Sequence, residues 1–494
     1  MLKPIIAGPD EAVAGRAGHA GHSKRTPSVR WALASLSLAM LLSSLGTSIA
    51  NVGLPSLAQA FDASFQQVQW VVLAYLLAIT TLIVSVGRLG DTSGRRRLLL
   101  AGIFVFTAAS GLCGVAPTLG LLIAARAAQG VGAAIMIALT MASVGETVPK
   151  SETGRAMGLL GTMSALGTAL GPSLGGVLIA GLGWRAIFLV NVPLGLLALL
   201  LAHRHLPVDR PGPTTGGAGF DPAGTLLLAL LLAAYALAMT IGRGSFGPLN
   251  MALLSAAVFG AGLFVFAETK AASPLIRLAT LRDPVLSASL AMSALVSTVM
   301  MATLVVGPFY LSRALGLAAA QVGLVLSVGP LAAALAGVPA GRLADRFGAR
   351  RSTLAGLVGM AAGCFALSMM PATFGVPGYI APMVAITVGY ALFQTANNTA
   401  VMADIADIRP DQRGVISGML NLSRNLGLIT GASVMGAVFA YASAAVDVSV
   451  APAEAVATGM RATFAAAAIL IVVALAIAVR TCARPRAAAK PLVR

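Results

Sequence analysis

Two stretches of this chain repeat one another in sequence and in setting. Residues 87–97 read GRLGDTSGRRR, and residues 341–351, about half the chain later, read GRLADRFGARR. Each follows one long apolar segment and precedes another. The chain is therefore expected to consist of two related membrane halves, each with the same charged hinge between its second and third spans. Internal repeats of this kind are typical of secondary transporter folds, in which the binding site lies between the halves.

Composition supports a polytopic membrane protein. Hydrophobic residues make up 58% of the chain and charged residues only 10%, whereas soluble domains carry roughly 25% charged residues. The net charge of +17 could suggest nucleic acid as a partner. The basic residues, however, lie in short loops between apolar segments, which is the topology signal of membrane proteins. We therefore expect no nucleic-acid partner.

Fourteen segments are apolar and long enough to cross a bilayer, for which about 20 residues are needed. They lie near 31–53, 68–88, 98–116, 119–143, 157–181, 186–202, 222–241, 249–267, 285–311, 321–341, 352–370, 378–402, 414–440 and 461–480. Lys and Arg are concentrated on the side that holds both chain ends and both hinges. The positive-inside rule then predicts cytoplasmic termini and a location in the inner cell membrane.

The predicted fold is all-α, with two pseudo-symmetric six-helix bundles and two extra transmembrane helices. The expected parts are a disordered cytoplasmic tail (1–29), the N-terminal bundle (30–206), a linker with the two extra spans (207–283), the C-terminal bundle (284–481) and a second tail (482–494). The extra spans break the symmetry of the halves and carry no mid-span charge. We expect them to be peripheral and not to line the central cavity.

Several motifs together resemble those of the major facilitator superfamily. The hinge resembles its G-x-L-x-D-x-x-G-R-R motif, and RAAQGVG at 126–132 resembles its span-four arginine motif. The sequence GTALGPSLGG at 167–176 resembles the span-five motif of its antiporters. Finally, LGTSIANVGLP at 45–55 and WRAIFLVNVPLG at 184–195 are similar to motifs of the fourteen-span drug:proton antiporter branch. The resemblance covers residues from about 35 to 480.

This resemblance implies export of a small amphipathic compound by alternating access, coupled to proton entry. The span-one motif of the branch usually carries an aspartate where this chain has Gly46, and that acid is taken to help bind cationic drugs or protons. All sixteen acidic residues of this chain fall in loops, tails or span ends. A proton site would then have to lie near a span end, and Glu146 and Asp404 are both candidates.

Two arginines, Arg126 and Arg424, are expected inside the membrane. An intramembrane charge is costly, so it marks a functional candidate. For Arg126, the alternative is a guanidinium bound to backbone carbonyls of neighbouring helices. Other polar residues cluster at helical spacing and either join helices by hydrogen bonds or line the cavity. With the arginines, the candidates for substrate binding or coupling are Thr47, Asn51, Gln129, Gln394, Asn397, Asn398, Asn421 and Asn425. The positive charge and the missing acid predict a preference for neutral or anionic substrates.

The hinge and the glycine-rich span have predicted mechanical roles. Gly87 would permit close backbone approach at a helix end, and Gly94 would turn the chain. We expect Asp91→Asn and Arg95→Ala to impair transport without preventing insertion. The full set of cytoplasmic gate candidates is Gly87, Asp91, Gly94, Arg95, Arg96, Asp345, Gly348 and Arg350. The candidates for close packing and a bend between the halves are Gly167, Gly171, Pro172, Gly175 and Gly176.

Other function classes are less well supported. Three cysteines and four histidines are scattered, without metal-ligand spacing, and no histidine lies in an apolar span. We therefore expect no metal, no cofactor and no enzyme, and no loop is long enough for a sensor domain. A proton-independent facilitator or a metabolite importer of the same fold remains an alternative. The expected partners are a small molecule, protons and the bilayer, and the expected state is a monomer.

Overall fold

The computed structural model describes residues 29–148, 153–207, 209, 221–241, 247–271, 283–406, 413–443 and 451–483. The elements in chain order are α1 (Val29–Val52), α2 (Leu54–Ala60), α3 (Phe65–Ser93), α4 (Arg95–Val115), α5 (Leu119–Thr147), α6 (Thr153–Leu182), α7 (Ala186–Leu189), α8 (Asn191–His205), α9 (Pro222–Thr240), α10 (Pro248–Lys270), α11 (Pro284–Phe309), η3 (Tyr310–Ala314), α12 (Ala319–Phe347), α13 (Ala349–Met369), η4 (Ala372–Phe374), α14 (Gly375–Ala406), α15 (Arg413–Thr430), η6 (Gly431–Met435), α16 (Gly436–Ala442) and α17 (Ala453–Ala483).

Fourteen helical segments are long and apolar enough to span a membrane, as the sequence predicted. Several begin at side chains that satisfy the free amides of a first turn. Ser64 and Gln67 form a reciprocal capping box at the start of α3, and Asp283 accepts from the amides of Val285 and Leu286 at the start of α11. Such caps fix where a helix begins when the flanking sequence is equally apolar.

The hinge motifs are more helical than the sequence predicted. Helix α3 continues to Ser93, so Gly87 lies within the helix, and a Cβ there would meet nothing within 4 Å. The chain turns only at Gly94, with φ +94°, and at Gly348, with φ +83°. Helices α3 and α12 continue without a break up to the residue before each of these glycines. Both glycines have a positive φ, which other residues rarely adopt. The expectation of close backbone approach at Gly87 was therefore wrong.

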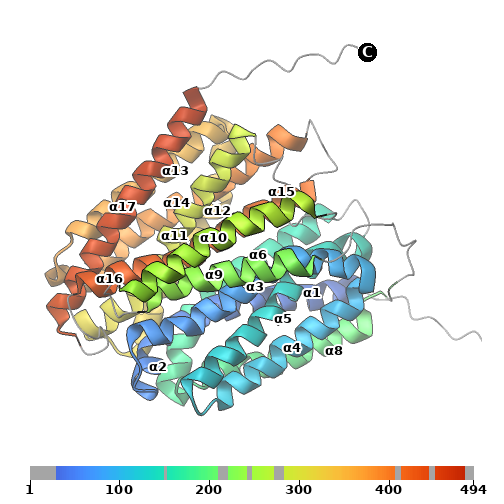
Figure 1. The fold of residues 1–494 in the computed structure, drawn as a ribbon, viewed down its shortest axis with the longest axis horizontal. Coiled ribbons are helices and arrows are strands. Elements are labelled where there is room, and N and C mark those ends of the chain that lie inside the picture. The colour runs from blue at the N-terminus through green and yellow to red at the C-terminus, as the bar shows by residue number, and fades with distance from the viewer. Residues whose placement is uncertain are drawn as a thin grey trace, which may run out of the picture.

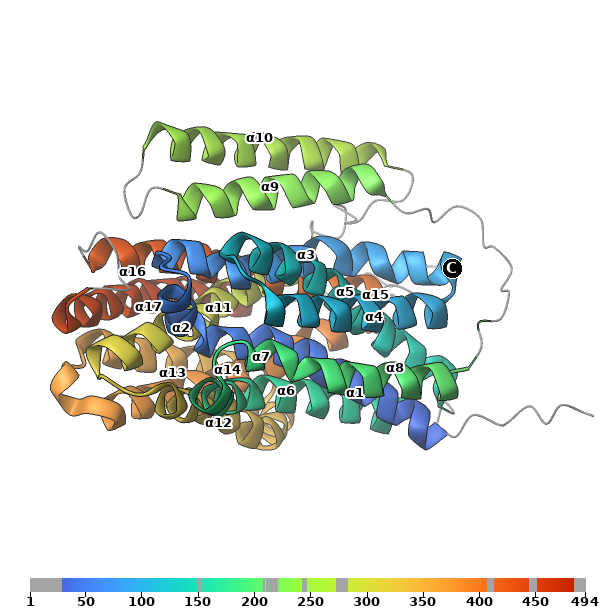
Figure 2. The same ribbon diagram turned by 90° about the horizontal axis from the view of Figure 1, so that it is seen from below.

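The helices form two bundles and an outer hairpin. Helices α1, α3, α4, α5, α6 and α8 make up the first bundle, and α11 to α17 make up the second (Figure 1). Helices α9 and α10 form a separate outer layer (Figure 2), in which α9 packs on α3 of the first bundle and on η6 and α16 of the second. Their peripheral position agrees with the expectation from sequence.

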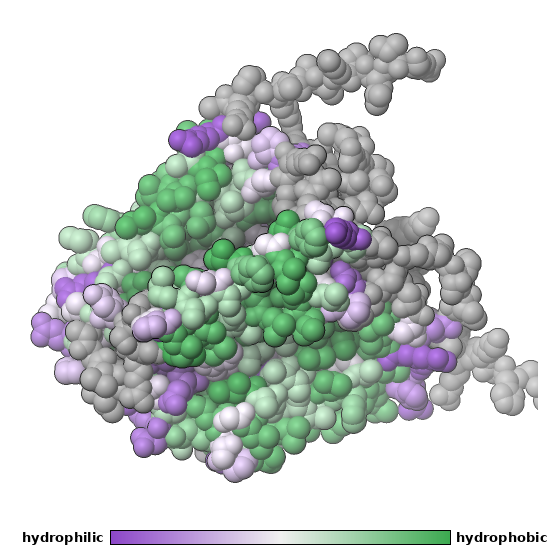
Figure 3. Space-filling model, in the orientation of Figure 1, coloured by the Kyte–Doolittle hydropathy of each residue, from purple (hydrophilic) through white to green (hydrophobic). Residues whose placement is uncertain are grey.

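The outer surface is suited to a bilayer. Figure 3 shows apolar side chains across the middle of the molecule and polar side chains toward its two ends. Phe104, Phe259 and Phe365 are among the large apolar side chains that are more than half exposed. We call the end with Gly94 and Gly348 the hinge face and the end with Asp62 and Gly316 the distal face.

Candidate functional site

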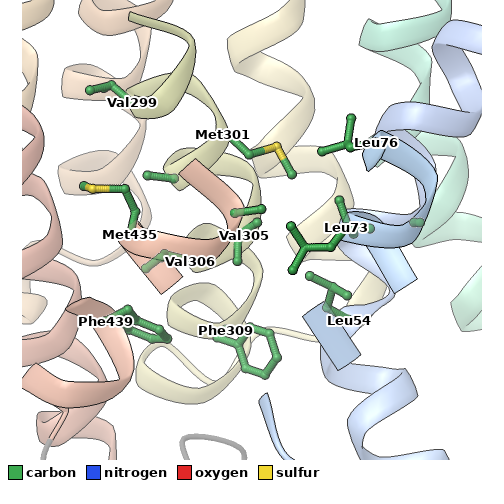
Figure 4. Packing of buried hydrophobic residues seen from close by; sticks show 14 of the residues in the cluster. Leu54, Leu73, Leu76, Val299, Met301, Val305, Val306, Phe309, Met435 and Phe439 are labelled. Carbon is green, nitrogen blue, oxygen red and sulfur yellow. The ribbon is translucent and has the colours of Figure 1, made fainter. Parts of the chain in front are cut away.

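The two halves meet in an apolar layer near the distal face. The Phe65 ring of α3 lies edge-on to Phe309 of α11, with centroids 4.8 Å apart, and to Phe439 of α16 at 5.4 Å. Leu54 and Leu73 of the first half and Val305 of the second pack in the same layer (Figure 4). These six residues, which we call the distal seal, are all fully buried. Their packing leaves no room for water between the halves at this level.

A glycine contact joins the halves at the same level on the other side. A Cβ on Gly176 of α6 would lie 2.7 Å from the Ala319 carbonyl and 2.9 Å from the Gly323 Cα of α12. The two helix backbones are therefore in direct contact, which only small residues allow.

The same two helix faces separate toward the hinge face. Gly158 lies about five turns before Gly176 on α6, and Gly341 lies about five turns after Gly323 on α12. Each pair therefore shares one helix face. Cβ atoms on Gly158 and Gly341 would meet nothing within 4 Å. The halves are thus in contact at the distal face and apart at the hinge face along this pair of helices.

The other glycines of α6 pack within the first half. Cβ atoms on Gly167, Gly171 and Gly175 would all strike α1, for instance the Leu41 carbonyl at 2.5 Å from Gly167. The carbonyl of Pro172 instead contacts Gly323 of α12. The sequence placed this whole motif between the halves. The structure divides it, because one face of α6 packs on α1 and the adjacent face packs on α12.

Arg126 lies in the middle of the first bundle and is fully buried. Its Nε donates to the Val71 carbonyl at 2.8 Å, and its Nη1 donates to the Gly46 carbonyl at 3.1 Å and to Gln129 Oε1 at 2.6 Å. The guanidinium also lies over the Tyr75 ring, 4.1 Å from its centroid. Within the described residues, Nη2 has no hydrogen-bond partner.

The motif glycines hold this site together. A Cβ on Gly130 would lie 2.5 Å from the Tyr75 carbonyl of α3, and one on Gly132 would lie 2.5 Å from the Phe106 nitrogen of α4. Close approach of both helices to α5 places the acceptors around Arg126. Gln129 extends the network to Ser110 through a 2.7 Å bond. Arg126 and Gln129 therefore join helices inside one half, which is the alternative that the sequence left open for the arginine.

Thr47 and Asn51 bond mainly to their own helix. Thr47 Oγ1 donates to the Ser43 carbonyl at 3.1 Å, and Asn51 Nδ2 donates to the Thr47 carbonyl at 3.0 Å. Asn51 is 1% exposed and its Oδ1 has no partner among the described residues. In this conformation neither Asn51 nor the Arg126 network is accessible to a substrate.

The polar residues of the second half are more accessible. Arg424 is exposed, and Asn421 and Asn425 on the same helix are partly exposed. On α14, Gln394 Nε2 donates to Asn398 Oδ1 at 3.3 Å, and both residues are partly exposed. Asn397 is an exception, since it is 2% exposed and reaches the Ser289 carbonyl of α11 at 3.5 Å.

Arg424 lies on a different side of α15 from the outer hairpin. Thr430 and Ser433 face the Tyr235 hydroxyl of α9. At 3.6 residues per turn, Arg424 projects from the helix in a direction that differs by about 120° or more from those of Thr430 and Ser433. A charged side chain is not stable against lipid tails. The exposed side chain of Arg424 therefore lies on the side of the helix that faces away from the hairpin.

The acidic candidates lie at helix ends. Glu146 is near the end of α5 and Asp404 near the end of α14, and both side chains fall outside the described part of the molecule. Glu268 lies at the end of its span, as the sequence predicted, two residues before the end of α10, and it is 3% exposed. The carboxylates of Glu268 and Asp221 both lie beside Gly224. A Cβ on this glycine would be 2.6 Å from Glu268 Oε1 and 2.5 Å from Asp221 Oδ2.

At the first hinge, Asp209 caps α4. Its carboxylate accepts from the Arg96 amide at 2.8 Å and the Arg97 amide at 3.1 Å. The Arg95 guanidinium donates to the Ala142 carbonyl of α5 at 3.4 Å. The Asp91 side chain lies outside the described residues, so its predicted role stays a prediction.

The second hinge is built differently. Asp345 and Arg350 are exposed, and a Cβ on Gly348 would meet nothing within 4 Å. At Gly94, by contrast, a Cβ would lie 2.5 Å from the Asp209 carboxylate. Both hinges therefore turn at a glycine, but within the described residues no side chain caps α13 as Asp209 caps α4.

Sequence reasoning missed Tyr75, Ser110 and Asp209. The first two are ordinary residues of apolar spans, and no spacing links them to Arg126, which lies on another helix. Asp209 follows the last span of the first bundle by a few residues. The sequence does not show how the chain runs after this span, so it could not predict that Asp209 lies beside the first residues of α4.

These features define a class of protein. Two helical bundles that pack together near the distal face and diverge along α6 and α12 toward the hinge face, built from fourteen apolar spans, form a membrane transporter rather than an enzyme. The chain belongs to the Major Facilitator Superfamily, whose family model matches residues 36–308 and 286–493. Its fourteen spans fit the drug-efflux branch.

Relatives and solved structures agree with this assignment. The chain is 33% identical to the uncharacterized transporter YebQ of Escherichia coli (82% of this chain, 88% of YebQ). It is 30% identical to the riboflavin transporter RibZ of Clostridioides difficile (82% and 86%) and to the multidrug resistance protein Stp of Mycobacterium tuberculosis (83% and 75%). The fold resembles an inward-facing bacterial homolog of the human lysosomal transporter Spinster, with a TM-score of 0.65, 17% identity and coverage of 92% and 97%.

Proposed function

We propose that this protein exports small amphipathic organic compounds, neutral or anionic, by alternating access coupled to proton influx. The hinge face would lie in the cytoplasm and the distal face outside. The observation that carries the proposal is the asymmetry of the contact between halves. The backbones of Gly176 and Gly323 are in contact near the distal face. Cβ atoms on Gly158 and Gly341, on the same two helix faces, would meet nothing within 4 Å. A substrate would then enter from the hinge face.

Substrate preference would depend on Arg424. It is exposed on α15, while Arg126 is enclosed by its own bundle. Among the described residues, the atoms nearest to a Cβ on Gly46 belong to Tyr75 and Phe106, and the Arg126 guanidinium binds the main-chain carbonyl of Gly46. A permanent cation near Arg424 would be repelled, and an anion attracted, more strongly than in water because the local dielectric is low.

Proton coupling would require a titratable carboxyl group. Glu146 and Asp404 remain candidates, and the burial of Glu268 adds a third. Neutralising the coupling residue should abolish gradient-driven export while leaving exchange of substrate across the membrane intact. Glu146→Gln, Asp404→Asn and Glu268→Gln, compared in one assay, would identify which residue is required.

A metabolite importer or a proton-independent facilitator is the second candidate. It is favoured by the similarity to a riboflavin transporter, which is as close as the similarity to the drug-resistance protein Stp. Direction of transport separates the two proposals. An importer would raise the cellular content of its substrate, and an exporter would lower it.

The test measures accumulation of a panel of neutral, anionic and cationic compounds in cells with and without the protein. It is repeated after a protonophore has collapsed the proton gradient. Export predicts lower accumulation with the protein and loss of this difference with the protonophore. A difference that survives the protonophore would contradict proton coupling, and higher accumulation would contradict export.

Location and assembly are tested separately. We propose an inner-membrane monomer with both chain ends in the cytoplasm, because described arginines such as Arg95, Arg204, Arg350 and Arg480 gather at the hinge face. A fluorescent protein fused to residue 494 should fluoresce, whereas alkaline phosphatase at the same position should be inactive. Light scattering of the detergent-purified protein would give its mass.

A further inference from the structure

A hydrogen bond crosses between the halves inside the apolar layer. Gln69 of α3 is 1% exposed, and its Nε2 donates to the Ala432 carbonyl of η6 at 3.0 Å. Phe65 of the distal seal lies about one turn before Gln69 on α3, and its ring packs against Phe309 and Phe439, which are labelled in Figure 4. A primary amide in such surroundings is costly unless it is paired. The side chain is therefore stable here only while the second half supplies its acceptor.

The acceptor is available because of the local helix geometry. Residues Gly431–Met435 form a π-helical segment between α15 and α16. In such a segment the main-chain bonds run to the fifth residue, which disturbs the regular pairing of carbonyls, and segments of this kind are often found at functional sites. The Gln69 amide donates to a carbonyl of this segment from the opposite half.

Gly436 makes space for the amide. A Cβ at this position would overlap Gln69 Nε2. No side chain larger than hydrogen fits there while Gln69 extends across to Ala432. Two residues from different halves, Gln69 and Gly436, are thus matched to one another in the closed distal face.

We propose that Gln69 is a latch of the distal face, which binds the π-helical carbonyl of Ala432 when the halves close and releases it to water when they open. The inference rests on the proposed alternating access. In the closed state Nε2 bonds to the Ala432 carbonyl, whereas Oε1 has no partner among the described residues. In the open state water can bond to both atoms. The latch therefore adds to the stability of the closed face without preventing its opening.

The test uses purified protein in detergent, in which both faces are accessible. Cys113, Cys364 and Cys482 are replaced, and Val305→Cys places a thiol in the distal seal. The rate of maleimide labelling then reports how often the seal opens. Gln69→Ala and Gly436→Ala should each raise this rate about 2- to 10-fold, the factor expected for loss of one neutral hydrogen bond.

Gln67→Ala is the matched control. Gln67 lies on the same helix and is exposed, and its side chain accepts from the Ser64 amide within the capping box at the start of α3. Its loss should leave the labelling rate unchanged. A Gly158→Cys reporter at the hinge face should be labelled more slowly in the Gln69→Ala protein, since a shift to the open distal face closes the hinge face.

Two outcomes would overturn the latch. One is an unchanged Val305→Cys rate in folded Gln69→Ala and Gly436→Ala proteins. The other is faster labelling of both reporters, which would mean general loosening. Either result alongside normal energy-dependent export would leave the proposed function standing. Opposite shifts of the two reporters without any export would support the latch and contradict the proposed function.

Discussion

The Arg126 guanidinium donates a hydrogen bond to the main-chain carbonyl of Gly46, with 3.1 Å between Nη1 and the oxygen. This contact joins the arginine of α5 to the residue of α1 at which the drug:proton antiporter branch usually has an aspartate. The arginine thus has a backbone partner where a carboxylate would otherwise be expected, and Tyr75 covers its face.

Arg126→Ala should destabilise the first bundle. It would leave a cavity and remove the donors to Val71, Gly46 and Gln129, so we expect the free energy of unfolding to fall by about 2–5 kcal/mol. Thermal unfolding in detergent measures this. Arg185→Ala is the control, because the Arg185 side chain is exposed, although its guanidinium also lies over the Trp184 ring. Normal stability with lost transport would instead assign Arg126 a coupling role.

Gly46→Asp should restore a counter-ion to Arg126, but it needs space. A Cβ on Gly46 would lie 2.9 Å from the Tyr75 hydroxyl and 3.3 Å from the Phe106 ring. We therefore expect the single variant to lower the unfolding temperature and Gly46→Asp with Tyr75→Phe to recover part of it. The added negative charge should raise resistance to quaternary ammonium dyes. Unchanged resistance in a stable double variant would contradict the charge argument.

Arg424→Gln should weaken export of carboxylates by about tenfold or more and leave neutral compounds nearly unaffected. The loss reflects one charge-assisted contact. Arg461→Gln is the matched control, because Arg461 is also exposed but lies near the distal end and bonds to Thr458. Transport into inside-out vesicles measures both variants. Strong export of quaternary cations alone by the unaltered protein would exclude this role.

Gly94→Ala should cost more stability than Gly348→Ala. Both glycines have positive φ, so either change costs about 1–3 kcal/mol. At Gly94 the new Cβ would also displace Asp209, and the loss of this cap adds about 1 kcal/mol. Asp209→Ala, which removes the cap and leaves Gly94 in place, should reproduce only the smaller part of the loss. Equal unfolding temperatures for the two alanine variants would show that Asp209 contributes nothing.

Gly158→Cys with Gly341→Cys should form a disulfide only when the hinge face closes. The two positions repeat the Gly176 and Gly323 contact about five turns away along the same helix faces. Oxidation of the purified protein should therefore proceed slowly at rest and faster with Gln69→Ala. Gly158→Cys with Gly337→Cys tests the adjacent register. Absence of either cross-link in a transport-active protein would rule out this closure.

The sequence determined the membrane class, the fourteen spans and the two-half plan, because these follow from long apolar runs, a repeated motif and the cost of charge in lipid. It also selected the residues with unusual chemistry, including Arg126, Arg424 and the hinge glycines. Periodicity could not say which face of a helix meets which neighbour. The sequence therefore treated the glycines of α6 as a single set, although Gly171 packs on α1 and Gly176 on α12.

Only the tertiary structure decided which polar residues are enclosed and which are exposed. Arg126 and Arg424 have the same side chain, yet one is fully buried between neighbouring helices and the other is exposed. The partners of Arg126 are main-chain carbonyls, which any sequence supplies. The pairing of Gln69 with Ala432 likewise depends on two segments that lie 363 residues apart. Such contacts arise from the packing of helices, and no local pattern of residues encodes them.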